Sequence, residues 1–71
     1  MLIPTDVYDD EGNLTQIEFY NMAGSFVIQA VWDEDEEQTS ENRVNFRKWA
    51  YRMVEQTGEE IVKWNRIYSL N

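Results

Sequence analysis

Six carboxyl groups lie within nine positions near the middle of the chain: Asp33, Glu34, Asp35, Glu36, Glu37 and Glu41. Asp33, Asp35 and Glu37 occupy alternate positions, as the first ligands of a calcium-binding loop do. However, that loop needs a glycine at its sixth position and a glutamate at its twelfth, and this chain has Gln38 and Val44 there. We therefore predict no specific cation site in this run.

The same run has the features of a solvated connection that leads into a helix. Negative charge close to a helix N-terminus is stabilising because the backbone N–H groups point toward it. Four of the six basic residues follow soon afterwards, at Arg43, Arg47, Lys48 and Arg52. We expect these cations to neutralise the acidic run locally, and the exposed acidic surface to comprise Asp33, Glu34, Asp35, Glu36 and Glu37.

Catalytic chemistry is difficult to assemble from the residue types of this chain. It contains neither histidine nor cysteine, so an imidazole base, a thiolate nucleophile and a thiolate zinc site are excluded. Its carboxylates lie in polar stretches, where their pKa values are expected to stay too low for acid catalysis at neutral pH. No glycine-rich phosphate loop is present. We predict that the chain is not an enzyme and uses no cofactor or metal.

The net charge of −8 further restricts the choice of partners. Direct binding to nucleic acid or to anionic lipid needs clustered cations, so neither is expected. An alternative is an acidic mimic of nucleic acid that inhibits a DNA- or RNA-handling enzyme.

No signal peptide or apolar run of about 20 residues is evident, and a cytoplasmic location is the default expectation. Short acidic chains are common among viral accessory proteins, but this likeness is compositional only.

Hydrophobic patterning predicts a single α+β domain over residues 1–71. Residues 2–8, 14–20 and 25–32 alternate as strands do, and a turn with Gly12 at positive φ separates the first two. Apolar residues then recur at helical spacing from about residue 40 to 57, with Ser40 or Thr39 as the N-cap. Residues 59–70 favour a last strand, which makes the order βββαβ. The alternative is a second helix, βββαα.

The predicted helix should cover one face of the predicted sheet. Its apolar stripe contains Phe46, Trp49, Ala50 and Met53. Strand alternation assigns Ile17, Phe19, Phe26, Ile28 and Trp32 to the covered face. If Trp49 is a core residue, its replacement by alanine should cost about 3–5 kcal/mol.

The opposite sheet face is the predicted interaction surface. Alternation assigns Leu14, Tyr20, Val27 and Val31 to it, mixed with polar residues. A half-apolar face on a small protein is typical of a contact with a partner, most simply a second copy. We therefore expect a small protein-interaction or assembly module that binds a protein partner or itself as a homodimer. The sequence does not indicate the biological process.

Overall fold

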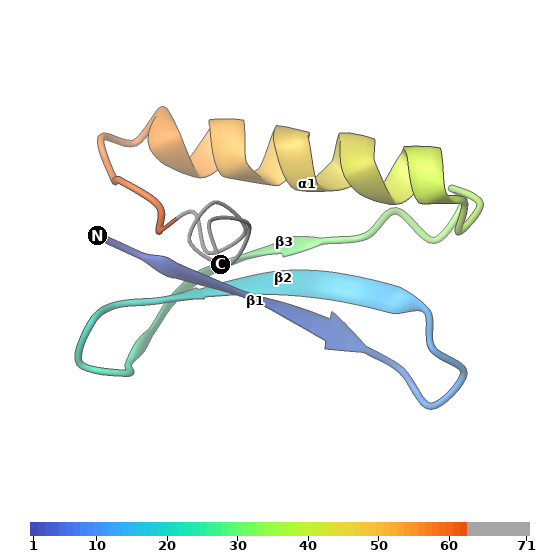
Figure 1. The fold of residues 1–71 in the computed structure, drawn as a ribbon, viewed down its shortest axis with the longest axis horizontal. Helices are drawn as coiled ribbons and strands as arrows, with labels where there is room; N and C mark the ends of the chain where they lie inside the picture. The colour runs from blue at the N-terminus through green and yellow to red at the C-terminus, as the bar shows by residue number, and fades with distance from the viewer. Residues whose placement is uncertain (63–71) are drawn as a thin grey trace, which may run out of the picture.

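The computed structural model describes residues 1–62, which form three antiparallel strands followed by one helix (Figure 1). Strands β1 (Ile3–Tyr8), β2 (Leu14–Tyr20) and β3 (Phe26–Val31) pair in sequence order. Helix α1 (Ser40–Glu55) crosses one face of the sheet and packs over the central strand. The predicted α+β class and the order of these four elements are therefore confirmed.

Two turns of the same design join the strands. In the first turn, Asp9 Oδ1 accepts hydrogen bonds from the N–H groups of Glu11 and Asn13, each at 2.9 Å, and Gly12 has φ +84°. In the second turn, Asn21 Oδ1 accepts from the residues two and four positions later, both at 3.0 Å, and Gly24 has φ +85°. A side-chain oxygen thus organises each turn, and the glycine adopts the left-handed backbone that other residues avoid. The predicted positive φ of Gly12 is confirmed.

A β-bulge follows each turn and reverses the alternation of side chains. In the first hairpin Val7 pairs with Gln16 while Tyr8 pairs with Leu14, so β2 has one extra residue there. In the second, Phe19 pairs with Ile28 while Tyr20 pairs with Phe26, so Val27 is the extra residue of β3. Each bulge moves the residues between it and the turn to the other face of the sheet.

These bulges overturn two predicted orientations. Leu14 was assigned to the exposed face, but it is completely buried. Phe26 was assigned to the helix-covered face, but it pairs with Tyr20 on the opposite face and is 52% exposed. Strict alternation from the strand centres gives the wrong face in both places because it does not allow for an extra residue.

The core lies between the sheet and α1. Its buried residues are Leu2, Ile17, Phe19, Ala30, Ala50, Val54 and Ile61, with Ile28, Phe46, Tyr51 and Met53 packed around them. Phe19 is fully buried, and its ring meets Tyr51 edge-on at 5.9 Å between centroids. Trp49 departs from the prediction because it is 51% exposed. The helix therefore turns toward the sheet through Ala50 and Val54, with Trp49 at its margin.

The two ends of the described chain pair with each other beside β1. Leu2 and Ile61 form a parallel bridge, in which the Leu2 N–H donates to Glu60 at 2.7 Å and its carbonyl accepts from Val62 at 2.9 Å. Both bridged side chains are buried. Most of the segment predicted as a last strand, or alternatively a helix, lies at residues 63–70, outside the described residues.

Candidate interaction surface

The sheet face opposite α1 is defined by cross-strand pairing, because paired residues share a face. Its nine residues are Ile3, Thr5 and Val7 of β1, Gln16, Glu18 and Tyr20 of β2, and Phe26, Gln29 and Val31 of β3. We call this set the outer face. Among the described residues, no helix covers it (Figure 1).

The outer face carries one charged group, although the chain as a whole has a net charge of −8. That group, Glu18, lies on the central strand and is bonded within the face. One of its carboxylate oxygens accepts from Gln16 Nε2 at 2.8 Å and the other from the Tyr20 hydroxyl at 2.9 Å. The bond to Glu18 raises the pKa of Tyr20, so its hydroxyl stays protonated and can donate. The carboxylate at the centre of the face is thus stabilised by two hydrogen bonds from neighbouring side chains.

Apolar side chains surround this polar centre. Phe26 and Val31 of β3 are 52% and 57% exposed, and the rings of Tyr20 and Phe26 meet edge-on at 6.0 Å. Ile3 and Val7 lie across the sheet on β1 and are partly buried. The face therefore offers large apolar groups at both sides of a bonded polar patch.

The two hairpins have the same design, so the exposure of Phe26 can be compared with that of the equivalent residue, Leu14. Phe26 and Leu14 are each the second residue after their turn glycine, and each pairs with a tyrosine. Leu14 lies on the helix side and is fully buried, whereas Phe26 lies on the outer face and is half exposed. Equivalent places in the two hairpins thus hold large apolar side chains, but only one of them is covered within the described residues.

The structure separates the four residues first assigned to the interaction surface. Tyr20 and Val31 lie on the outer face, Val27 is the exposed bulge residue of β3, and Leu14 belongs to the interior. Sequence reasoning missed Phe26 and did not connect Val7 with this face. If the strands paired regularly from the first turn onward, Val7 would pair with Thr15 and lie on the helix side. The extra residue of β2 makes Val7 pair with Gln16 instead, which places Val7 on the outer face.

The acidic run forms an ordered loop with exposed carboxylates. Asp33 through Glu37 are all exposed. Their backbone is held by side chains around them: Trp32 Nε1 donates to the Glu36 carbonyl at 3.1 Å, and Asn42 Nδ2 donates to the Glu37 carbonyl at 2.9 Å. In residues 1–62 no group of three or more acidic side chains is arranged to hold a metal ion.

Two basic residues of α1, Arg43 and Arg47, bind groups other than the carboxylates of the acidic run, and within residues 1–62 no ion pair joins the run to the helix. Arg43 Nη1 donates to the Gln38 carbonyl at 3.0 Å. Arg47 forms an ion pair with Asp6 of β1 at 2.8 Å and donates to the Tyr8 hydroxyl at 3.1 Å. Partial burial acts to lower the pKa of Arg47, but bonding to Asp6 and its charge raise the pKa above the ordinary value. Arg43 thus connects the helix to the preceding loop, and Arg47 connects it to β1.

The comparisons with known proteins identify no relative. No protein-family model matches the sequence, and neither a curated protein nor a solved structure gives a match. Within the described part of the chain, no helix is long and apolar enough to span a membrane.

Proposed function

We propose that this chain is a non-enzymatic cytoplasmic interaction module that self-associates through its outer face. The observation that carries the proposal is the contrast in charge: one carboxylate among nine residues, on a chain of net charge −8. Like-charged copies repel, so their most favourable contact is the face with the least charge. A two-fold axis would place the apolar groups of one copy against those of the other.

The size of the outer face sets the expected strength of this contact. Three strands about 4.8 Å apart, each with about 20 Å in the sheet, cover a footprint of roughly 300 Å² per copy. Stable protein interfaces bury about 800 Å² per partner. The face alone is therefore suited to a reversible dimer, with a dissociation constant of micromolar order or weaker.

Sedimentation equilibrium tests the proposal directly. The wild-type chain should pass from monomer to dimer between about 10 and 500 µM. Raising NaCl from roughly 50 to 500 mM should preserve or strengthen the dimer, because salt screens repulsion and leaves apolar contacts in place. A monomer at the highest concentration would contradict self-association.

A matched pair of variants identifies the contact surface. Thr5→Lys with Phe26→Lys places two cations on the outer face of each copy, where both residues are exposed, and should give a folded monomer. Val44→Lys with Gln56→Lys makes the same charge change at exposed positions on and beside α1, and should leave association intact. Equal loss in both variants would mean that the outer face is not the contact. Circular dichroism verifies that each variant is folded.

A further inference from the structure

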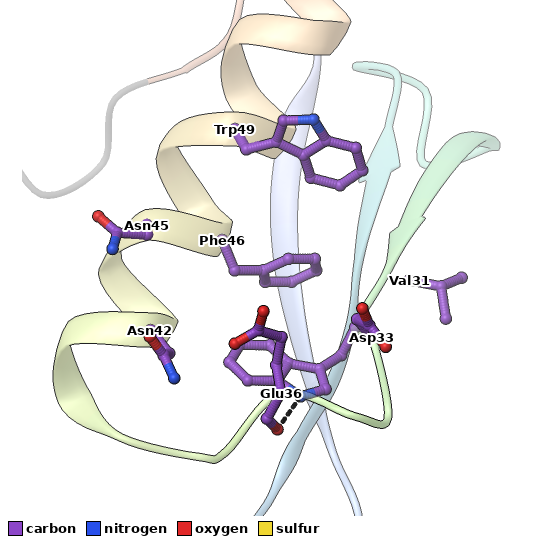
Figure 2. A pocket seen from close by; sticks show the side chains of 8 residues that line it. Val31, Asp33, Glu36, Asn42, Asn45, Phe46 and Trp49 are labelled. Carbon is purple, nitrogen blue, oxygen red and sulfur yellow. Dashed lines mark hydrogen bonds between the residues drawn. The ribbon is translucent and has the colours of Figure 1, made fainter.

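A recess lies between α1 and the end of β3 (Figure 2). Its volume is about 470 Å³, within the range of about 300–1,000 Å³ that ligand sites occupy. Figure 2 shows the rings of Phe46 and Trp49 projecting from the helix one above the other, with Asp33 and Glu36 beside Phe46. The recess shares Val31 with the outer face, but its other lining residues belong to α1, to Trp32 and to the loop before the helix.

The aromatic walls are held in place by contacts within the chain. Trp32 is 8% exposed, and its indole N–H donates to the Glu36 carbonyl at 3.1 Å. Phe46 meets Trp32 edge-on, with 5.1 Å between ring centroids, and its ring is tilted by 31° to that of Trp49. Trp49, at the end of this row, keeps half of its surface exposed. The recess thus presents a preformed aromatic surface.

The charged lining of the recess has a single sign. Within residues 1–62, Asp33 and Glu36 are the ionisable residues that line it, and no basic residue does. Asp33 Oδ1 already accepts the Asp35 N–H at 3.0 Å. The side chain of Glu36 has no hydrogen-bond or ion-pair partner among residues 1–62. An aromatic ring beside an unpartnered carboxylate attracts a cation by two effects, the negative ring face and the full charge.

We propose that this recess binds an arginine side chain presented by a basic partner peptide. A guanidinium group is planar, so it can lie on the row of rings formed by Phe46 and Trp49 while its N–H groups point to the Glu36 carboxylate, which lies beside Phe46. A lysine ammonium also carries a positive charge, but it cannot stack as a plane or form the forked hydrogen bonds. The recess should therefore prefer arginine to lysine.

The test uses the indole N–H signals of the three tryptophans in a two-dimensional NMR titration. The probe is the peptide acetyl-Gly-Arg-Gly-Arg-Gly-amide, compared with the same peptide containing lysine or the neutral arginine analogue citrulline. The arginine peptide should shift the Trp49 signal saturably, and the lysine peptide should bind about two- to fivefold more weakly. The citrulline peptide should cause no saturable shift. Equal binding of citrulline would overturn the proposal.

Two substitutions separate a specific site from general attraction to an acidic protein. Glu36→Gln should weaken arginine binding about two- to fivefold, as expected for loss of an exposed ion pair. Glu41→Gln makes the same charge change at an exposed residue outside the recess and should leave binding nearly unchanged. An equal effect of both substitutions would overturn the site. A Trp49 signal that moves with protein concentration alone would also overturn it, by identifying a second copy as the occupant.

Discussion

At the scale of single residues, two aromatic rings that were assigned to the core from sequence differ in burial. Phe19 is completely buried, and Trp49 is half exposed. Both belong to regular apolar patterns, so periodicity alone does not distinguish them. The distinction arises because Ala50, the next residue along the helix, is small enough to bring the helix close to the sheet. Trp49 is consequently left at the edge of the helix contact.

This difference predicts unequal costs of truncation. Phe19→Ala should cost about 3–5 kcal/mol, because it removes a fully buried ring and leaves a cavity. That loss is a large part of the total stability of a small domain. Trp49→Ala should cost about 1 kcal/mol, since only part of its ring leaves water on folding. Urea unfolding followed by circular dichroism measures both, and equal costs would show that Trp49 is packed more deeply than described.

At the scale of elements, much of the fold follows from local pattern. The three strands, the first turn and the helix were predicted from periodicity and glycine position, and the helix begins at Ser40 with Thr39 as its N-cap. The face on which Leu14 and Phe26 lie was not predictable in the same way. A bulge adds one residue without changing the apolar pattern, so no single-strand period reveals it. The candidate surface was therefore only partly assigned from sequence.

Another feature that periodicity does not reveal is the bond between the loop before α1 and the start of β2. The Gln38 side chain accepts from the Leu14 N–H at 3.1 Å and donates to the Leu14 carbonyl at 2.8 Å. Its amide thus pairs with one residue of β2 as the backbone of a neighbouring strand would. Arg43 contacts the carbonyl of the same glutamine at 3.0 Å, so the start of α1 is connected to the sheet through this side chain.

Replacing Gln38 tests how much this connection contributes to stability. Gln38→Met keeps the length of the side chain but removes both hydrogen bonds to Leu14, and should cost about 1–3 kcal/mol. Gln56→Met is the matched control, because Gln56 is exposed just after the helix, and should change stability by less than about 0.5 kcal/mol. Chemical denaturation gives both values. A Gln38 variant as stable as the control would mean that water replaces the two bonds without loss.

At the scale of the whole molecule, the acidic run contributes charge more than structure. Its carboxylates are exposed, while the surrounding contacts hold its backbone. Substituting Asp33→Asn, Asp35→Asn and Glu37→Gln changes the net charge from −8 to −5, because three negative charges are removed. We expect the fold to persist and the melting temperature to stay constant or rise slightly, since self-repulsion decreases. The Asp33→Asn substitution retains a side-chain oxygen that can accept the N–H of residue 35.

Thermal melting with and without calcium checks this expectation. Addition of about 1 mM calcium, far above the dissociation constants of sensor sites, should give no saturable rise in melting temperature. A saturable rise that disappears in the triple variant would restore a cation site in the run. The nucleic-acid mimic makes a different prediction, because its complex with a basic partner enzyme would be held by opposite charges and should weaken steeply as salt rises.

The bridge between Leu2 and Ile61 has a consequence for cooperativity. In an unfolded chain, bringing together residues about 60 positions apart carries a substantial loop-closure entropy. Once β1 has paired with β2 and α1 has packed on the sheet, the intervening chain is already ordered and the two residues lie close together. The bridge therefore forms at little entropic cost only when the rest of the fold is present. The bridge therefore couples the two ends of the fold: separation of β1 from the sheet and release of α1 from the sheet should occur together.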